Sequence, residues 1–371
     1  MDFIEEDEIG QLCLTKQFSK EVSLDSFEMN CVIGKGQYAK VLLVRKKDTK
    51  HLYALKVLKK SGLKQDARIE RNIMIEIQHP FIIKLVYAFQ TASHLYFCME
   101  YCPGGEMYYL LSKQKHFSEH TAMFYAAQII LALEYLHSKG IIFRDLKPEN
   151  IVICQDGYVK LTDFGLCKKG DFTNISGASS ICGTPAYMAP EILLSKQYGK
   201  AVDWWAFGCF LYEMVAGHPP FFASNKQDLE YSIVNSQPNM GHFSIKLQDL
   251  LYRLLEKNPK NRLTTNVRDH QWFNIDFDAI LNKKETAPFL PTLQNEADVT
   301  YFDPQFIKSS MSEQCSIIDE LDSYKDFTYK GSQEQSVQQS FQTLSPEIIG
   351  LNENGEAKQM IKVESTEMIN Q

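Results

Sequence analysis

Residues 141–165 read IIFRDLKPENIVICQDGYVKLTDFG, and this stretch is more informative than any other part of the chain. Asp145, Lys147 and Asn150 lie within six positions, between apolar runs that predict short strands. A second acid, Asp163, follows in the tripeptide Asp-Phe-Gly. An acid, a base and an amide at such offsets on loops between short strands can hold a metal ion, a phosphate and a hydroxyl together. The stretch therefore predicts the centre of an enzyme site.

The composition is that of a globular protein large enough for two lobes. The chain has 371 residues, of which 44% are hydrophobic and 23% charged, and no run approaches the roughly 18 apolar residues of a membrane span. The acidic start MDFIEEDEIG predicts no secretory signal. The nine cysteines form no CxxC pair, which indicates a reducing compartment and no zinc site. We expect a cytoplasmic protein, with entry into the nucleus left open.

The net charge of −7 hides an asymmetry. Residues 27–273 carry 30 basic and 22 acidic side chains, whereas residues 1–26 carry 2 and 7, and residues 274–371 carry 7 and 17. A basic central region suits an anionic ligand. The acidic ends either wrap this region or only keep the chain soluble, and solubility is the simpler interpretation. No patch typical of nucleic-acid binding is visible.

The first lobe is predicted to begin at Phe27 with three strands, at about 27–34, 38–45 and 52–58. Gly34 and Gly36 lie between the first two. A strand, not a helix, follows them, which excludes a dinucleotide-binding fold. The turn is either an ordinary hairpin or a glycine loop whose backbone N–H groups approach phosphate oxygens closely.

A lysine in the third predicted strand needs a partner. Lys56 has apolar neighbours in YALKVL, and a lysine is rarely buried unpaired. A helix is predicted next, because Ile69, Ile73 and Ile77 recur every four residues. Glu70 on that helix is the preferred partner, and Glu76 is the competing acid.

The second lobe is predicted to be mainly helical. A strand predicted at residues 95–100 leads into a hinge between the lobes. After the hinge, a short helix is predicted from Glu106 to about Lys113. Ser118 is the expected N-cap of a long helix that ends near Gly140. Later helices are expected at 201–216, 226–235, 246–256 and 265–272. The predicted fold class is therefore α+β with two lobes.

Several motifs in order resemble those of the eukaryotic protein kinases, and specifically of the AGC group of serine/threonine kinases. The chain is most similar to protein kinase B and the serum- and glucocorticoid-regulated kinases, from about Phe27 to Tyr329. The motifs that carry the resemblance are Gly34-Lys35-Gly36, Ala54-Leu55-Lys56, Arg144-Asp145-Leu146-Lys147-Pro148-Glu149-Asn150, Asp163-Phe164-Gly165 and Ala189-Pro190-Glu191. The third glycine of the kinase loop is replaced by Ala39.

The resemblance implies a protein kinase that uses ATP and Mg²⁺, with Mn²⁺ as an alternative metal. Asp145 and Lys147 would be catalytic, and Asn150 and Asp163 would bind the metal. Phe302 would close over the nucleotide. The residues implied in nucleotide binding are Ile33, Gly34, Lys35, Gly36, Gln37, Val41, Ala54, Lys56, Glu70, Met99, Glu100, Cys102, Glu106, Glu149, Asn150 and Asp163.

The resemblance also implies residues that support the site. Glu191 and Arg262 match a buried ion pair, and Asp203 matches an acid that braces the catalytic loop. Thr184 matches a threonine whose hydroxyl touches Asp145 and Lys147.

Substrate choice and regulation follow from the same resemblance. Glu106, Glu149 and Glu213 match acids that hold arginines upstream of the target hydroxyl, which implies protein substrates with basic motifs. A glutamate usual in the family is Ala186 here, which puts recognition of a more distant arginine in doubt.

Two phosphorylation sites are implied, and with them upstream activating kinases. Ser180 in the activation loop is one, with Ser179 as its competitor, and Thr328 in the C-terminal hydrophobic motif is the other. Arg144 and Lys168 are the expected partners of a phosphate on Ser180. Asp66 replaces a histidine that usually reaches that phosphate, so coupling to the Glu70 helix is in doubt.

The expected organisation is a flexible acidic arm (1–26), a catalytic domain (27–273), an AGC-type C-terminal extension (274–331) and a disordered tail (332–371). We expect a monomer without a membrane-binding module of its own. The competing hypothesis is a pseudokinase scaffold, which usually lacks at least one of Lys56, Glu70, Asp145, Asn150 and Asp163.

Overall fold

The computed structural model describes residues 22–36, 39–61, 63, 66–241, 243–309, 324 and 326–331. Residues 1–331 form one unit and residues 332–371 a second, which lies wholly outside the described residues. The predicted disordered tail therefore remains a prediction. Most of the predicted N-terminal arm also lies outside the described residues, and its described end contains a short 3-10 helix, Leu24–Ser26.

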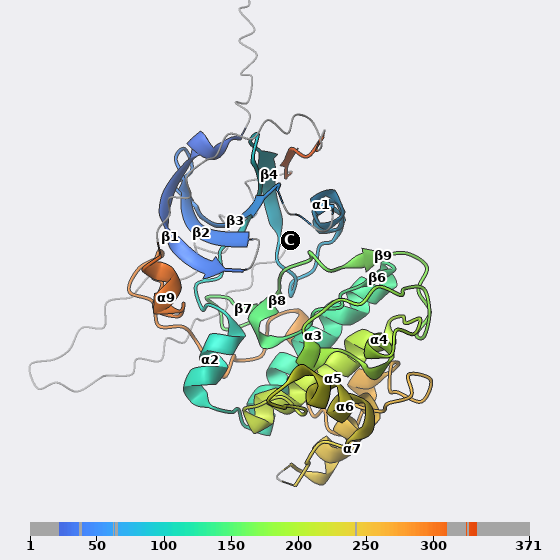
Figure 1. Cartoon of the computed structure of the whole chain (residues 1–371). Coiled ribbons are helices and arrows are strands. Elements are labelled where there is room, and N and C mark those ends of the chain that lie inside the picture. The colour runs from blue at the N-terminus through green and yellow to red at the C-terminus, as the bar shows by residue number, and fades with distance from the viewer. Residues whose placement is uncertain are drawn as a thin grey trace, which may run out of the picture. The chain divides into compact units, whose positions relative to one another are not determined.

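The first lobe is built on an antiparallel sheet of six strands (Figure 1). Their order is β1 (Phe27–Lys35), β2 (Ala39–Lys46), β3 (Leu52–Lys59), β5 (His94–Glu100), β4 (Leu85–Gln90) and β10 (Tyr329–Lys330). The three predicted strands are confirmed to within one residue at each end. Val41 of β2 pairs with Lys56 of β3, so the register brings Lys56 next to the glycine turn.

The helix α1 (Ala67–Glu76) packs beside this sheet. Asp66 caps it, because its side chain accepts a hydrogen bond from the backbone N–H of Arg68 at 2.9 Å. The buried face of α1 consists of Ala67, Glu70, Ile73 and Met74, while Ile69 is 51% exposed. A carboxylate thus occupies the inward face of the helix.

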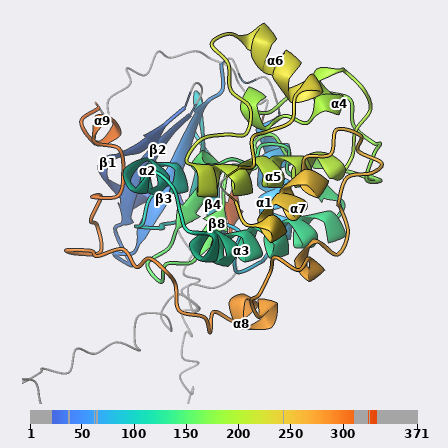
Figure 2. The same cartoon turned by 90° about the horizontal axis from the view of Figure 1, so that it is seen from below.

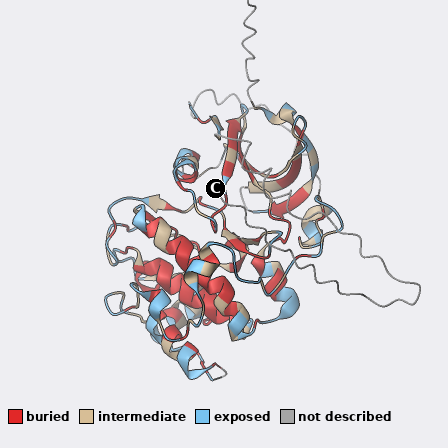
Figure 3. Cartoon of the chain, turned by 180° about the vertical axis from the view of Figure 1, so that it is seen from behind, coloured by how far each residue is buried: buried red, intermediate tan, exposed pale blue. Residues whose placement is uncertain are grey.

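The second lobe is helical (Figure 2). Its largest helices, described next, are buried almost all round. The helix α3 (Glu119–Ser138) begins at the predicted cap Ser118, whose Oγ accepts from the N–H of Thr121 at 3.1 Å. The helix α5 (Ala201–Ala216) ends at Gly217 in the left-handed conformation, with φ +81°. Figure 3 shows the buried residues concentrated in these helices. The expected α+β fold with two lobes is confirmed.

The remaining helices complete the second lobe and the extension. They are α2 (Met107–Gln114), α4 (Pro190–Leu193), α6 (Lys226–Asn235), α7 (Ile245–Leu254), α8 (Phe277–Leu281) and α9 (Pro304–Ile307). The helix predicted at 265–272 is wrong, since only a 3-10 turn, Val267–Asp269, is present. Asn266 adopts a left-handed conformation with φ +54°, which prevents a continuous α-helix through this segment.

Two small antiparallel sheets hold the loops between the lobes. One pairs β6 (Ile141–Ile142) with β9 (Lys168–Lys169), and the other pairs β7 (Ile151–Ile153) with β8 (Val159–Leu161). The segment 141–169 is therefore anchored at both ends and in its middle. Within the described residues, no helix is long and apolar enough to cross a membrane.

Candidate active site

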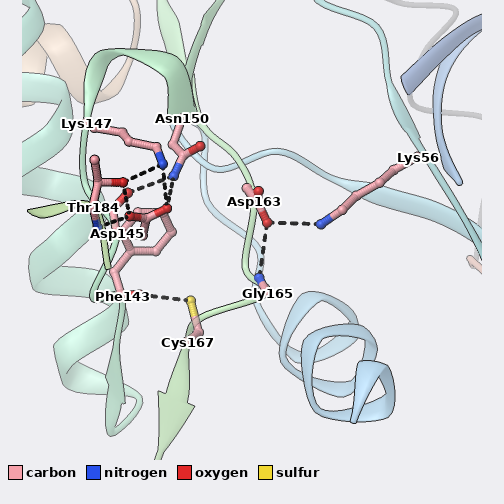
Figure 4. Close-up of polar contacts among 9 residues, drawn as sticks. All are labelled: Lys56, Phe143, Asp145, Lys147, Asn150, Asp163, Gly165, Cys167 and Thr184. Atoms are coloured by element: carbon pink, nitrogen blue, oxygen red, sulfur yellow. Dashed lines mark hydrogen bonds and ion pairs between the residues drawn. The ribbon is translucent and has the colours of Figure 1, made fainter. Parts of the chain in front are cut away.

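The catalytic loop is ordered by its own polar side chains (Figure 4). Nδ2 of Asn150 donates to the backbone oxygen of Asp145 at 2.7 Å and to its Oδ2 at 2.9 Å. Nζ of Lys147 lies 2.9 Å from the same Oδ2. These contacts, with the 3-10 turn Pro148–Asn150, hold the Asp145 carboxylate in one orientation.

Thr184 joins this group from the activation segment, 39 residues further along the chain. Its backbone N–H and its Oγ1 donate to Oδ1 of Asp145 at 3.1 and 2.9 Å, and Oγ1 accepts from Nζ of Lys147 at 2.7 Å. The hydroxyl of Thr184 therefore touches both Asp145 and Lys147, which is the contact that the sequence analysis expected. A carboxylate held by three hydrogen-bond donors beside a lysine is suited to accept or orient the proton of a hydroxyl.

Asp203 fixes the backbone just before Asp145. It is fully buried, and its two carboxylate oxygens accept from the backbone N–H groups of Phe143 at 2.9 Å and Arg144 at 2.8 Å. Arg144 has φ +73°, a left-handed conformation that a non-glycine residue adopts only when its surroundings hold it there. The ring of His137 adds a third contact, at 2.7 Å from Oδ2. His137 was missed from the sequence, since nothing local links it to Asp203, 66 residues away.

On the nucleotide side, Lys56 lies between two acids. Its Nζ is 2.7 Å from Oε1 of Glu70 and 2.9 Å from Oδ1 of Asp163. Burial alone would lower the pKa of Lys56, but the attraction of both carboxylates outweighs burial and raises it. The Lys56 ammonium in turn lowers the pKa of Asp163. Lys56 is therefore a fixed positive charge at this position, and Glu70 rather than Glu76 is its partner on α1.

The donor atoms near Asp145 fit a hard divalent cation. Lys56 and the N–H of Gly165 contact Oδ1 of Asp163, so within the described residues its Oδ2 is available to a metal ion. Asn150 donates through Nδ2 to Asp145, so its own Oδ1 is likewise available to a metal ion. Mg²⁺ prefers one or two such protein oxygens together with substrate phosphates and water. In the described part of the chain no group of three or more His, Cys, Asp or Glu side chains forms a metal cage. Asn150 and Asp163 would thus hold the ion jointly with a bound nucleotide.

A cavity of 380 Å³ opens between the glycine turn, the hinge and the catalytic loop. Of the residues expected around a nucleotide, Gln37 lies outside the described residues and Glu70 stands behind Lys56 without lining the cavity. All the others line it, namely Ile33, Gly34, Lys35, Gly36, Val41, Ala54, Lys56, Met99, Glu100, Cys102, Glu106, Glu149, Asn150 and Asp163. Phe302 of the C-terminal extension lines it as well and stacks on Tyr101, with ring centroids 5.9 Å apart.

Two acids that line this cavity, Glu106 and Glu149, form a cluster with Glu213, which lies near Glu149. Burial and the neighbouring Glu149 and Asp303 raise the pKa of Glu106 to about 7. Oε2 of Glu149 is buried and finds no hydrogen-bond partner among the described residues. Burial raises the pKa of Glu213 to about 6, even though Tyr187 donates a hydrogen bond to its carboxylate. Carboxylates held together without a cation attract a guanidinium or ammonium group.

Ser180 lies against the arginine of the catalytic loop. Nη1 of Arg144 donates to Oγ of Ser180 at 2.7 Å, while Nε of Arg144 donates to the backbone oxygen of Leu166 at 2.6 Å. The hydroxyl of Tyr198 donates to the backbone oxygen of Ser180 at 2.6 Å and lies 3.1 Å from Nη1 of Arg144. Ser179 and Ser180 are both exposed. Tyr198 was missed from the sequence, because it belongs to no motif.

Comparisons with known proteins agree with this geometry. The family described as "Protein kinase domain" matches residues 27–273. The RAC family serine/threonine-protein kinase homolog of Dictyostelium discoideum is 40% identical over 330 residues, which are 85% of this chain and 74% of the relative. Serine/threonine-protein kinase sgk-1 of Caenorhabditis elegans is 40% identical over 78% of this chain and 65% of its own length. Serine/threonine-protein kinase Sgk1 of Rattus norvegicus is 42% identical over 74% of this chain and 66% of its own length.

The chain belongs to the AGC group of serine/threonine protein kinases. This kinase spans somewhat less than two thirds of the length of two of these relatives. Its kinase domain implies the use of ATP and a divalent metal ion.

The C-terminal extension of this kinase returns to the first lobe. Phe327 is fully buried, with its ring 5.4 Å from that of Phe97 in an edge-to-face arrangement and the Arg71 guanidinium 5.5 Å from its centroid. Arg71 also donates to the backbone oxygen of Asp326, and Nε2 of Gln90 donates to that of Tyr324 at 2.8 Å. Thr328 is exposed beside this docked phenylalanine. The segment thus packs next to α1, the helix that carries Glu70.

The late helices of the kinase are tied to the activation segment by a buried ion pair. Glu191 and Arg262 form a bidentate pair with N–O distances of 2.7 and 2.9 Å, and both side chains are at most 2% exposed. Nη1 of Arg262 also donates to the backbone oxygen of Ala201 at 2.9 Å. This pair is where the sequence analysis expected it.

The cavity of the kinase also contains residues that the motifs did not indicate. They are mostly apolar and come from strands, linkers and the extension, and only their neighbours in the folded chain identify them: Ile83, Tyr101, Val152, Thr162 and Phe306.

Proposed function

We propose that this kinase transfers the γ-phosphate of ATP to serine and threonine hydroxyls of proteins, with Mg²⁺ as its preferred metal ion and Mn²⁺ as an alternative. The observation that supports this most strongly is the arrangement around Asp145. Its carboxylate is held by Asn150 and Thr184 beside Lys147, and the charged Lys56 lies at Asp163. Phosphoryl transfer depends mainly on such positioning and charge neutralisation.

Each residue has a separate task in this proposal. Asp145 accepts or orients the proton of the substrate hydroxyl, while Lys147 offsets negative charge on the phosphate being transferred. Lys56 binds phosphate oxygens of the nucleotide, and Glu70 keeps the ammonium in place. Bound at Asn150 and Asp163, the metal ion would neutralise charge on the phosphates.

A pseudokinase scaffold is the competing function. It is disfavoured because all five residues whose loss is typical of pseudokinases are present and paired, namely Lys56, Glu70, Asp145, Asn150 and Asp163. The deciding experiment is transfer of radiolabelled phosphate from ATP to a basic peptide. We expect transfer by the parent chain and none by Asp163→Ala. Absence of transfer by a parent chain activated by an upstream kinase would favour the scaffold.

We further propose that the substrates carry arginine about three residues before the target hydroxyl. The acid cluster Glu106, Glu149 and Glu213 supports this preference, because a guanidinium would offset its negative charge. Burial and the neighbouring carboxylates raise the pKa of Glu106 even though Lys147 opposes the shift. Ala186 gives no acid for a more distant arginine. A peptide array tests the preference, and equal phosphorylation of peptides with and without the upstream arginine would contradict it.

Regulation by upstream kinases completes the proposal. A phosphate on Ser180 would add about −1.5 to −2 charges next to the Arg144 guanidinium. Thr328 would be the second phosphosite, beside the docked Phe327. We propose that the kinase acts as a monomer in the cytoplasm.

A further inference from the structure

Two cysteines from distant parts of the sequence meet at the edge of the nucleotide cavity. Cys102 belongs to the hinge after β5, and Cys154 directly follows β7. Their sulfur atoms lie 3.2 Å apart, although 52 residues separate them. Of the seven cysteines that the structure describes, only these two have their thiols within hydrogen-bonding distance of each other. We propose that the pair is a redox-modification site, at which a hydroperoxide converts the two thiols into an intramolecular disulfide.

The backbone next to both cysteines is already held at short range. The N–H of Gly104 donates to the oxygen of Ile153 at 2.9 Å, and the N–H of Ile153 donates to the oxygen of Gly105 at 2.9 Å. A Cβ on Gly104 would lie 2.7 Å from the oxygen of Ile153, so no side chain separates the two segments there. Disulfide sulfurs lie about 2.05 Å apart, so the two thiols need to approach by only about 1 Å. Ordinary side-chain rotation with a small hinge adjustment supplies such a movement.

The exposure of the two thiols sets the order of reaction. Cys154 is half-buried, whereas Cys102 is 6% exposed, so a small oxidant meets Cys154 first. The hydrogen bond to Cys154 and burial raise the pKa of the Cys102 thiol, which makes it the poorer first nucleophile.

A cation lies close to both sulfurs. Nζ of Lys160 is 2.8 Å from Oε1 of Glu100. Burial opposes its charge, but Glu100 and both cysteines raise the pKa of Lys160, so it remains an ammonium group. The thiolate is the reactive form of cysteine, and a neighbouring ammonium favours it. At the Cys102 thiol, Lys160 opposes the neighbouring Glu100 carboxylate without reversing the raised pKa.

The reaction is balanced with one hydroperoxide. The Cys154 thiolate attacks an oxygen of the O–O bond, so that an S–O bond forms, the O–O bond breaks, and water or an alcohol leaves with the thiol proton. The sulfur of Cys102 then attacks the sulfenic sulfur of Cys154. The S–S bond forms, the S–O bond breaks, and the hydroxide departs as water with the proton of Cys102. Two thiols are oxidised and one peroxide is reduced.

The disulfide would act on the nucleotide cavity, a consequence that rests on the function proposed above. Cys102 lines the cavity, and its backbone is where the hinge would contact an adenine. Drawing its sulfur toward Cys154 moves the hinge toward β7 and restricts the bending that the two lobes need. The oxidised protein should therefore bind nucleotide more weakly.

Mass spectrometry of the full chain tests the modification itself. After hydrogen peroxide treatment, blocking of free thiols and digestion without reductant, we expect a cross-linked peptide that contains Cys102 and Cys154 and disappears with dithiothreitol. Cys154→Ser should abolish this peptide, and the matched control Cys182→Ser, also half-buried, should retain it. The proposal is overturned if both thiols remain free to alkylate, or if Cys154 is oxidised to sulfinic acid while Cys102 stays reduced. Both contradicting outcomes are measured on the parent chain, so the test remains valid even if a variant does not fold.

A fluorescent ATP analogue tests the consequence. We expect at least about threefold weaker binding after oxidation, recovery with dithiothreitol, and no change in peroxide-treated Cys154→Ser. A fully cross-linked parent chain with unchanged affinity would overturn the link to the nucleotide cavity. Failure of the reduced chain to bind the analogue would instead contradict the proposed function, because formation of the cross-link does not depend on a nucleotide.

Discussion

Nη1 of Arg144 lies 2.7 Å from Oγ of Ser180, although 36 residues separate the two. Arg144 immediately precedes Asp145, and its left-handed backbone is held by Asp203. A change of charge at Ser180 therefore acts on the residue next to the carboxylate that would orient the substrate. This contact explains why the activation segment and the catalytic loop should respond together.

Ser180→Ala is expected to lower kcat about tenfold to a hundredfold in a chain treated with an upstream kinase. A phosphate on Ser180 would form charge-assisted hydrogen bonds with Arg144, each about 1.5–3 kcal/mol, and alanine removes them. Ser179→Ala is the matched control. Ser179 is also exposed, and within the described residues it makes no hydrogen bond to Arg144. If Ser179→Ala lost the activity and Ser180→Ala retained it, the phosphosite would be Ser179.

The raised pKa of Glu106 predicts a pH-dependent affinity for arginine peptides. Below about pH 7 the Glu106 carboxyl is mostly protonated and neutral, and above it the group is charged. Pairing with a guanidinium requires the charged form, so KM for such a peptide should rise as the pH falls through 7 and level off above it. Peptide KM measured between about pH 6 and about pH 8 tests this.

Glu106→Gln should raise KM for the arginine peptide about tenfold to a hundredfold and flatten its pH dependence. A peptide with alanine in place of the upstream arginine is the control, because its KM should hardly change with either pH or the substitution. An unchanged pH dependence in Glu106→Gln would assign the titration to another group, with Glu213, whose pKa is about 6, as the first candidate.

Local patterns were enough to predict much of the fold and the site. The alternation at residues 52–58 predicted a strand, and a lysine within it required an acid. Glu70 was preferred over Glu76, and the structure pairs Lys56 with Glu70. The ordered motifs led to Asp145, Asn150 and Asp163, because phosphoryl transfer needs these groups at nearly fixed offsets. The structure brings the same residues around one cavity.

Contacts between distant residues that belong to none of the family's motifs could not be predicted from the sequence. The four-residue period that included Ile69 indicated a helix but not which face meets the sheet, and Ile69 is exposed while Glu70 is buried. Asp66 was expected to weaken coupling to the helix α1, and in the structure it caps that helix. The helix predicted at 265–272 is absent because Asn266 adopts a left-handed backbone conformation, which hydrophobic periodicity does not reveal. Tyr198 and the Cys102–Cys154 contact depend on folded neighbours alone.

The buried pair Glu191–Arg262 predicts a large loss of stability on truncation. Arg262→Ala should lower the free energy of unfolding by about 3–5 kcal/mol, because it leaves the Glu191 carboxylate buried without its cation. Arg268→Ala is the matched control. Its partner Glu134 is partly exposed, and such a pair contributes at most about 1 kcal/mol. Urea denaturation of both variants measures the difference, and equal losses would show that burial of the first pair does not matter.

The docked extension predicts that Thr328 controls catalysis more than nucleotide binding. Arg71 of α1 contacts both Asp326 and the ring of Phe327. Its neighbour in the sequence, Glu70, forms the ion pair with Lys56. A phosphate on Thr328 would strengthen this docking and keep α1 in place, whereas the walls of the nucleotide cavity stay as they are. Thr328→Ala should therefore lower kcat about threefold to tenfold with little change in KM for ATP.

Thr328→Ser is the matched control, because it retains a hydroxyl that an upstream kinase can phosphorylate and should keep the parent activity. Phe327→Ala should mimic Thr328→Ala even in a phosphorylated chain, since the phenylalanine side chain makes the buried contact with Phe97 that docks the segment. Equal kcat of Thr328→Ala and the parent chain, both measured after treatment with the upstream kinase, would show that docking of Phe327 holds α1 without any phosphate. A loss in Thr328→Ala that appeared in KM for ATP alone would place the effect at the cavity, through Phe302 of the same extension.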